Sequence, residues 1–425
     1  MKTDRRRFLG QLATGATALP AAFLATRTAF AKNLDALSVD TLAAGEFAAL
    51  REQYMLDPQV VYLNHASIGT VPRVVSEAHS GYLRACERNP WAHIWGGDWD
   101  EPREEVRQQC AALLRCQASE VALTHNTTEV FNVLAQGLPL GPGDEVLFSS
   151  LNHPGASVAF ELMGKRRGFS VKRFHFPVER VSAMSADDVV DVYTQQITDS
   201  TRLLVIPHID NIVGLRYPVE KLARAARSKG VEFVAVDGAQ SVGMVPVDVS
   251  RLAVDVYAAS PHKWLQAPKG LGLMYVNERI QPVLEPMWVT WGQKDWHGSA
   301  RKYEDYGTRN LPEVLALGHA ISFHQRIAMD VREQRLRALW SHARNLAHES
   351  QHADWISPRR WREASAICAV RLRRGDARRV AQSAFGKHGT VVRGFTSEGL
   401  NSLRLSPNVF TTQREIERFF ELIRA

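Results

Sequence analysis

The stretch DVYAASPHKWLQAPKGLGLMYVN, residues 255–277, decides the fold class of this chain. Two apolar runs within it, residues 256–259 and 271–276, are typical of short buried strands. Lys263 lies between them, so we expect its amine at the end of a strand. An arbitrary lysine is mostly exposed to solvent. At the end of a buried strand, however, a lysine whose pKa is lowered can be a nucleophile that forms a Schiff base.

A carboxylate ends the preceding apolar strand, because residues 231–237 read VEFVAVD and finish at Asp237. Open α/β sheets place ligand-binding groups at the carboxyl ends of their strands. Ser260, His262 and the glycine-rich backbone after Lys263 could ligate a phosphate. An amine, a carboxylate and phosphate ligands are the parts of a site for pyridoxal 5′-phosphate (PLP). There the carboxylate would keep the pyridine nitrogen protonated.

The pattern VDGAQ at residues 236–240, followed from Ser260 by S-x-H-K-W-x-x-x-P-K-G-x-G, resembles the class V aminotransferase family of fold-type I PLP enzymes. Within that family it resembles in particular the isopenicillin N epimerase-like group. The resemblance implies that Lys263 holds the cofactor, that Asp237 faces its pyridine nitrogen, and that Gln240 hydrogen-bonds its ring oxygen.

Apolar strands are indicated from about residues 121, 144, 170, 201, 231, 256 and 271, and helical segments separate most of them. This alternation predicts an α/β fold with a seven-stranded, mostly parallel, doubly wound sheet. It agrees with the fold-type I PLP transferase fold that the resemblance implies. The predicted organisation is a signal peptide (1–31), an N-terminal helix and linker (32–60), a large PLP-binding domain (61–319) and a smaller α+β C-terminal domain (320–425).

The predicted strand at 121–124 runs into Thr127 and Thr128, which open an apolar helix. The first turn of a helix offers free N–H groups and the positive end of the helix dipole to an anion. By itself this pattern is more often an ordinary N-cap. The resemblance implies that both threonines hold the PLP phosphate, together with Ser260 and His262.

Two further strand ends carry polar residues, His153 after the strand at 144–150 and Asn211 after the strand at 201–209. The resemblance implies that His153 lies flat on the cofactor ring and helps with proton transfer there. It also implies that Asn211 contacts a cofactor oxygen or the substrate carboxylate.

Two stretches are candidates for substrate binding. In YLNHASIGT, residues 62–70, Asn64 is either a substrate contact or a plain turn residue. In NSLRLSP, residues 401–407, Arg404 matches the family arginine that binds the substrate α-carboxylate through paired hydrogen bonds. Without the resemblance, an arginine on a lone strand would more often form a surface ion pair.

The tetrapeptide GTRN, residues 307–310, is a further family match. The resemblance implies that Thr308 reaches across a dimer interface to the partner's cofactor phosphate, and therefore that the protein is a homodimer with shared active sites. An aromatic cluster that includes Trp91 and His93 is either a packing or dimer contact or a wall of the substrate site.

The N-terminus is typical of a targeting segment. Residues 4–9 read DRRRFL, a twin-arginine pattern, and a weakly apolar stretch leads to Ala29-Phe30-Ala31. The apolar part is too short and too interrupted to span a membrane. We therefore expect export to the periplasm by the twin-arginine translocase, with cleavage after about Ala31. Because that route carries folded proteins, the cofactor would be inserted before export.

Net charge and cysteine spacing argue against a nucleic-acid-binding protein and a zinc protein. The first 31 residues carry five basic side chains and one acidic one, so the remainder holds only +3 of the total net charge of +7. This small excess does not indicate nucleic-acid binding. The four cysteines lack CxxC spacing and a histidine cluster, which argues against a zinc site. The sequence leaves open whether Cys110 and Cys116 form a disulfide.

These motifs specify cofactor chemistry on an amino acid, or on an amino-acid moiety of a larger metabolite, and leave transamination, epimerisation and elimination open. An aminotransferase is the first interpretation, with the tailoring of a peptidic metabolite in the periplasm as its setting. An epimerase or lyase is the alternative. A cysteine desulfurase needs a mobile thiol, whereas Cys368 lies in an apolar strand at 366–372. A non-catalytic binding protein would have been favoured by loss of Lys263, Asp237 or Arg404, and all three are present.

Overall fold

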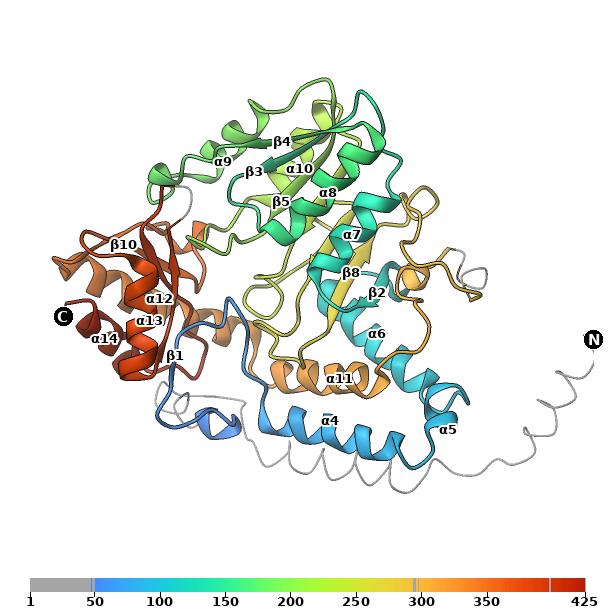
Figure 1. Ribbon diagram of the computed structural model, residues 1–425, viewed down its shortest axis with the longest axis horizontal. Coiled ribbons are helices and arrows are strands. Elements are labelled where there is room, and N and C mark those ends of the chain that lie inside the picture. The colour runs from blue at the N-terminus through green and yellow to red at the C-terminus, as the bar shows by residue number, and fades with distance from the viewer. Residues whose placement is uncertain (1–46, 48–49, 293–295, 297, 397–398, 425) are drawn as a thin grey trace, which may run out of the picture. The chain divides into compact units, whose positions relative to one another are not determined.

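Seven strands form the largest sheet of the computed structural model, which describes residues 47, 50–292, 296, 298–396 and 399–424 (Figure 1). The strand order is β2-β8-β7-β6-β5-β3-β4. Strand β8 is antiparallel to both of its neighbours, and every other neighbouring pair is parallel. The prediction of a seven-stranded, mostly parallel sheet is therefore confirmed. The strands are β2 (Val121–Thr124), β3 (Glu145–Ser149), β4 (Ser170–Phe174), β5 (Thr201–Pro207), β6 (Phe233–Asp237), β7 (Val256–Ala259) and β8 (Gly272–Val276).

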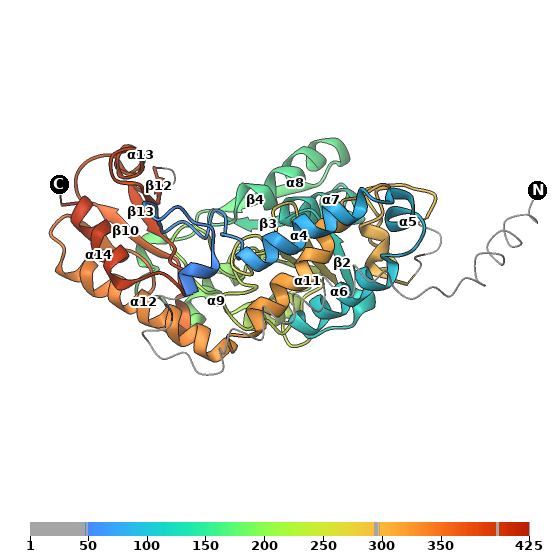
Figure 2. The same ribbon diagram turned by 90° about the horizontal axis from the view of Figure 1, so that it is seen from below.

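Four strands of the large sheet are mainly apolar and fully buried, although β6 ends in Asp237 and β2 in Thr124. Every residue of β2, β6, β7 and β8 is buried, as expected for a sheet between two helical layers. Alternate residues of these strands join one core with α7 and α8. The helices that accompany the sheet are α4 (Arg73–Cys86), α5 (Pro90–Ile94), α6 (Asp100–Leu114), α7 (Thr127–Gly137), α8 (Pro154–Arg167), α9 (Ala186–Thr194), α10 (Val219–Ser228) and α11 (Leu311–Gln325). Helix α4 packs along α11 (Figures 1 and 2).

A second, four-stranded sheet follows in the chain, with the antiparallel order β12-β13-β10-β9. The predicted strand at 366–372 corresponds to β10, and the lone strand expected to carry Arg404 corresponds to β13, whereas β9 and β12 were not predicted. The predicted border between residues 319 and 320 falls inside α11, and the division into two domains stays a prediction. The elements are α12 (Met329–Glu349), β9 (Ala353–Trp355), β10 (Cys368–Leu372), α13 (Ala377–His388), β12 (Arg393–Phe395), β13 (Ser402–Leu405) and α14 (Gln413–Leu422).

A two-stranded parallel sheet links distant parts of the chain. Strand β1 (Val61–Tyr62) pairs with β11 (Thr390–Val391), and Asn64 then forms a bridge with Ser406. Residues 61 and 63 also contribute to the core that contains α12, β10 and β13. The loop at 62–70 is thus held against residues more than 300 positions later in the sequence.

Several predictions concern segments outside these elements. The predicted signal peptide, residues 1–31, and most of the linker at 32–60 lie outside the described residues. No helix in the described part of the chain is long and apolar enough to cross a membrane.

All four cysteines are free thiols, so the disulfide left open for Cys110 and Cys116 is not formed. No group of three or more potential metal ligands occurs among the described residues.

Candidate active site

A cavity of about 240 Å³, called here the inner cavity, lies where strands of the large sheet end. Its lining residues follow β2, β3, β5, β6 and β7, so five loops that are far apart in sequence meet there. This is the position expected for a ligand site in an open α/β sheet. Nine residues selected from the sequence line it: Thr127, Thr128, His153, Asn211, Asp237, Gln240, Ser260, His262 and Lys263.

Hydroxyl groups and a helix terminus meet at one end of the inner cavity. Thr127 begins α7, and its Oγ1 lies 2.6 Å from Oγ of Ser260. A Cβ atom added at Gly155 would lie 2.7 Å from Oγ1 of Thr128, so glycine there leaves space around that hydroxyl. Nδ1 of His262 is buried and has no hydrogen-bond partner among the described residues. The N–H groups and hydroxyls of this end suit a phosphate-type anion.

Lys263 and Asp237 are two of the ionisable residues that line the inner cavity. Asp237 ends β6, and its Oδ1 accepts a hydrogen bond of 3.0 Å from the Ala239 N–H group. Desolvation lowers the pKa of Lys263 to about 8; Asp237 acts in the opposite direction, and the positive charge of Arg404 adds to the lowering. A large share of the Lys263 amine is therefore neutral, and so nucleophilic, at slightly alkaline pH.

His153 is the N-cap residue of α8, where its Nδ1 accepts a hydrogen bond of 3.0 Å from the Gly155 N–H group. Desolvation lowers the pKa of the imidazole, and Lys263 and Arg404 add to this effect against the influence of Asp237. The ring is therefore neutral at pH 7 and carries its proton on Nε2. In this arrangement His153 is a hydrogen-bond donor toward the cavity, and its role in proton transfer stays a prediction.

Gln240 is fixed at both ends of its amide. Nε2 donates to the Ala66 carbonyl oxygen at 2.9 Å, and Oε1 accepts from Nε1 of Trp264 at 2.8 Å. One hydrogen on Nε2 is left for a ligand. The orientation agrees with the predicted contact to a ring oxygen.

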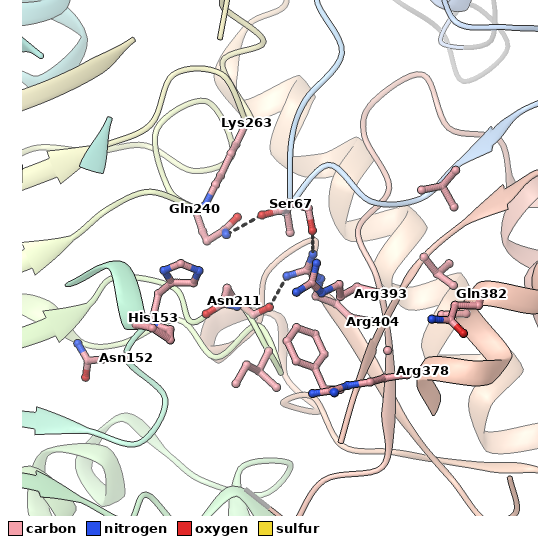
Figure 3. Close-up of a pocket in the computed structure, with 18 of the residues that line it drawn as sticks. Ser67, Asn152, His153, Asn211, Gln240, Lys263, Arg378, Gln382, Arg393 and Arg404 are labelled. Atoms are coloured by element: carbon pink, nitrogen blue, oxygen red, sulfur yellow. Dashed lines mark hydrogen bonds between the residues drawn. The ribbon is translucent and has the colours of Figure 1, made fainter. Parts of the chain in front are cut away.

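A second, larger cavity of about 1000 Å³, called here the outer cavity, adjoins the inner one (Figure 3). The two cavities share five lining residues, which makes them parts of one site. The outer cavity adds Arg404 from β13 and residues of β12 and α13, so both larger sheets contribute to it. The shared residues are Ser67, His153, Asn211, Gln240 and Lys263.

Arg404 is a buried guanidinium group without a carboxylate partner in the described part of the chain. Its side chain is 2% exposed. It donates to the Asn211 carbonyl oxygen at 2.5 Å, to Oδ1 of Asn64 at 2.8 Å and to Oγ of Ser67 at 2.6 Å. Its Nε has no partner among the described residues, and burial lowers its pKa to about 9. A buried cation held by neutral acceptors is suited to an anionic ligand.

Asn64, predicted as a substrate contact, is not among the residues that line either cavity. Its side chain positions Arg404 instead. Ser67 lines both cavities and also orients Arg404, although no sequence pattern distinguished it from the other residues of the loop at 62–70. The two residues of the Ser67–Arg404 pair are 337 positions apart, so neither periodicity nor a local motif could reveal it.

Asp210 is a second functional residue that was not predicted. It lines the inner cavity and is buried. Its carboxylate accepts hydrogen bonds from the N–H groups of Ile212, Val213 and Leu215, which fixes the turn that carries Asn211. Burial nevertheless raises its pKa to about 6. An aspartate directly after a buried strand was the available signal.

Thr308 lines a separate cavity of about 280 Å³, together with Trp95 and Trp291. Within one chain the structure does not bring it to Lys263, and its predicted role in a partner's site stays a prediction.

In the aromatic cluster, Trp91 is 73% exposed, and the ring of His93 stacks on that of Trp99 with 4.4 Å between the ring centres. Neither Trp91 nor His93 lines the inner or outer cavity, so the structure gives no support to a substrate wall in this cluster.

No thiol faces the site. Cys368 lies in β10 with no exposed surface, and burial raises its pKa. None of the four cysteines lines the inner or outer cavity. A buried, protonated thiol is unreactive, which supports the prediction that this chain lacks the catalytic cysteine of a desulfurase.

Comparison with known proteins agrees with this geometry. The family model "Aminotransferase class-V" matches residues 61–419. The chain is 29% identical over 406 residues to isopenicillin N epimerase of Amycolatopsis lactamdurans, covering 90% of this chain and 99% of that protein. It is also 29% identical over 327 residues to a probable cysteine desulfurase of Halobacterium salinarum, covering 74% and 77% of the two chains. Among solved structures, a mutant of C-DES with glycine covalently linked to its PLP cofactor superposes with a TM-score of 0.79 at 22% identity, covering 90% and 99%.

Proposed function

Because the chain belongs to the class V aminotransferase family of PLP-dependent enzymes, we propose that it is an aminotransferase that acts on an α-amino acid. One observation carries the proposal: the amine of Lys263 and the guanidinium group of Arg404 face the same cavity. Arg404 has no acidic partner among the described residues, and it suits the α-carboxylate. The lysine suits the proton on Cα.

The inner cavity fits PLP by the chemistry of its donor set. Thr127, Thr128 and Ser260 offer hydroxyls to the phosphate beside the first turn of α7. Asp237 offers a carboxylate to the pyridine nitrogen, and Lys263 offers an amine to the aldehyde. When bound, PLP withdraws electrons from Cα of the attached amino acid and so weakens the Cα–H bond.

Lys263 is the base that this site provides. With a pKa of about 8, its amine takes a proton from Cα readily near neutral pH. Transamination needs one base that receives this proton and returns it to a second carbon. His153 presents an N–H group rather than a lone pair to the cavity. Lys263 can perform both proton transfers, which supports transamination.

Epimerisation is the second candidate, and the similarity to an isopenicillin N epimerase over 90% of the chain favours it. It requires that a proton return to the opposite face of Cα. Elimination that depends on a catalytic thiol is disfavoured, because none of the four cysteines lines the inner or outer cavity.

The experiment that tests the proposal follows hydrogen at Cα. The PLP-loaded protein is incubated in D₂O with a panel of L-amino acids and a 2-oxo acid acceptor. We expect the 2-oxo acid of one donor to form in step with the new amino acid, and deuterium to appear at Cα. Formation of the D-enantiomer of a donor without a 2-oxo acid would show epimerisation instead of transamination. If Cα of every donor keeps its hydrogen, the protein is a binding protein and both candidates fail.

We propose further that two copies share their active sites. Trp291 shares a cavity with Thr308 and is 77% exposed, and Val289, two residues earlier in the chain, is 86% exposed. Large exposed apolar side chains of this kind favour a partner. If Thr308 completes the partner's site, mixing inactive Lys263→Ala with inactive Thr308→Asp protein should restore about a quarter of wild-type activity, because half of the dimers regain one intact site. Each variant alone is the control. Mixtures that stay inactive after subunit exchange would refute shared sites.

Export to the periplasm is also a proposal, supported by Arg5, Arg6 and the A-x-A sequence at 29–31. Such a location would suit a substrate finished outside the cytoplasm, such as a peptidic metabolite that carries an amino-acid moiety. Cell fractionation of the full chain and of an Arg5→Lys, Arg6→Lys variant tests the location, since only the former should reach the periplasm.

A further inference from the structure

The hydrogen bonds of Arg404 leave no complete edge of its guanidinium group for a carboxylate. A guanidinium group has five N–H donors in one plane, two on each terminal nitrogen and one on Nε. Both hydrogens of Nη2 are used, since Nη2 donates to Oδ1 of Asn64 at 2.8 Å and to Oγ of Ser67 at 2.6 Å. Nη1 donates to the Asn211 carbonyl oxygen at 2.5 Å. Nε is buried and has no partner among the described residues.

The shape of the guanidinium group limits how a carboxylate can bind to it. A carboxylate pairs with two N–H groups on one edge of the plane. Two edges are open, Nε with Nη2 and Nη1 with Nη2, because Cδ blocks the third. Nη2 belongs to both open edges. A paired carboxylate must therefore replace either Asn64 or Ser67 at Nη2, and the unpartnered Nε indicates that it takes the edge formed by Nε and Nη2.

Ser67 is the acceptor that faces a ligand. It lines both the inner and the outer cavity, whereas Asn64 lines neither. In Figure 3 a dashed line joins the Ser67 hydroxyl to the guanidinium group of Arg404. Asn64 is held elsewhere by its bridge to Ser406. A carboxylate that enters from the outer cavity therefore meets Ser67 and leaves Asn64 in place.

The backbone around Ser67 does not depend on its bond to the guanidinium group. On one side, the Ala66 carbonyl oxygen accepts from Nε2 of Gln240 at 2.9 Å. On the other side, the Gly69 N–H group donates to the carbonyl oxygen of His262 at 2.8 Å. The Ser67 hydroxyl can thus turn away by rotation about the Cα–Cβ bond while the loop stays in place. Its displacement changes one side chain rather than the fold of the loop.

The exchange of Ser67 for a carboxylate is favourable but has a cost. Hydrogen bonds between a guanidinium group and a carboxylate are charged on both sides and are stronger than those to a neutral hydroxyl. Without a ligand, however, Ser67 keeps an N–H group of the buried Arg404 paired, and an unpaired buried donor is destabilising. The bond to Ser67 therefore stabilises the unliganded site, and its loss on binding lowers the affinity for the carboxylate.

We propose that Ser67 is a displaceable positioning residue. Its hydroxyl holds the guanidinium group of Arg404 until the α-carboxylate of the substrate replaces it at Nη2, while Asn64 stays bound to the same nitrogen. This proposal rests on the proposed function and adds the step by which that site accepts its substrate. It implies opposite effects of two neighbouring residues, because Ser67 lowers the affinity for a carboxylate and Asn64 raises it.

Equilibrium binding of an unreactive ligand measures these two signs. Hexanoate, which has no amino group, is titrated calorimetrically into the PLP-loaded wild-type, Ser67→Ala and Asn64→Ala proteins. Ser67→Ala should bind hexanoate about fivefold more tightly, since one typical hydrogen bond no longer has to be broken. Asn64→Ala should bind it about fivefold less tightly, because this acceptor orients the guanidinium group in the bound state as well. A merely structural role of Ser67 would weaken binding in both variants.

A matched ligand and two further variants serve as controls. Hexanamide offers one acceptor, which Nε can satisfy alone, so Ser67→Ala should change its affinity by less than about twofold. Ser76→Ala should leave hexanoate binding unchanged, because Ser76 lies in α4 and lines neither cavity. Ser67→Cys keeps a side chain of similar shape with a weak acceptor, so it should also bind hexanoate more tightly. The melting temperature of each variant shows that it is folded.

The proposal is overturned if both Ser67 variants bind hexanoate no more tightly than wild type, or if hexanamide gains as much as hexanoate. The proposed function is tested independently by deuterium exchange at Cα. A protein that exchanges Cα hydrogen, but whose Ser67 variants show no gain for hexanoate, would refute this inference alone. The expected signs without any exchange at Cα would refute the proposed function and keep Arg404 as a carboxylate site controlled by Ser67.

Discussion

Replacing Lys263 by alanine should abolish covalent attachment of PLP and lower kcat/KM by about 1,000-fold or more. The same amine is the nucleophile toward the aldehyde and the base at Cα, and removal of a positioned base typically costs about 10²–10⁴-fold. The measurement is the visible absorption of the protein, with reduction by borohydride followed by mass determination of the labelled peptide. A variant that retains a reducible bond to PLP would show that another amine holds the cofactor.

Lys269→Ala is the matched control. Lys269 follows six residues later, is exposed and lines neither the inner nor the outer cavity. It should keep both the absorption and the activity. The melting temperature of each variant separates loss of the amine from loss of the fold, and Lys263→Ala should remain folded because it removes a partly desolvated cation.

The lowered pKa of Lys263 also fixes the direction of a pH effect. Only the neutral amine attacks an aldehyde, so the rate of PLP incorporation into cofactor-free protein should rise as the pH increases through about 8 and then level off. With an ordinary lysine pKa the rise would continue to above pH 10. A stopped-flow pH series distinguishes these profiles.

The second large effect is expected from Arg404→Gln. This change should lower kcat/KM for the best amino acid by about 100-fold, because a buried charge pair in a binding site is commonly worth about 2–5 kcal/mol. For the decarboxylated amine of the same side chain, the effect should stay below about fivefold. The ratio of the two values is the readout, since a general disturbance of the site would lower both. Equal losses for acid and amine would show that Arg404 has a structural role only.

Arg404→Lys provides the graded control. Lysine keeps the charge but loses the planar fork that donates simultaneously to Asn211, Asn64 and Ser67. We expect an intermediate loss for the amino acid. An Asn64→Ala variant should resemble it, because Asn64 orients the guanidinium group without lining the cavity.

Most of the large sheet could be predicted because its strands are continuous apolar runs that end in polar residues. The predicted strands at 121–124 and 256–259 agree with β2 and β7 residue by residue. The strand predicted at 201–209 is two residues shorter in the structure. Strand β5 ends at Pro207, because Ile209 pairs with Arg216 in a turn instead. Strand β11 was missed because its two residues carry no detectable periodicity.

The inner cavity was predictable to a greater extent than the outer one. Most of its residues stand at strand ends or in a family pattern and so carry a local signal, whereas Ser67 does not. Arg378 and Arg393, in contrast, lie on α13 and β12 with no motif of their own. They line the outer cavity because of tertiary contacts: Gly394 lets β12 approach Ala377, and Arg393 pairs with Arg404 across β12 and β13. Such contacts are not visible in a local reading of sequence.

The pairing of β1 with β11 imposes an order of events during synthesis. The residues of the inner cavity between 127 and 263 leave the ribosome early and include Gln240, which holds the loop with Ser67 at Ala66. The same loop also contacts β11 and Arg404, and Arg404 lies 337 residues after Ser67. Contacts of such large sequence separation form late in folding. A nascent chain can therefore have the cofactor ligands and still lack a complete substrate site, so amino-acid chemistry begins only once both distant segments have docked.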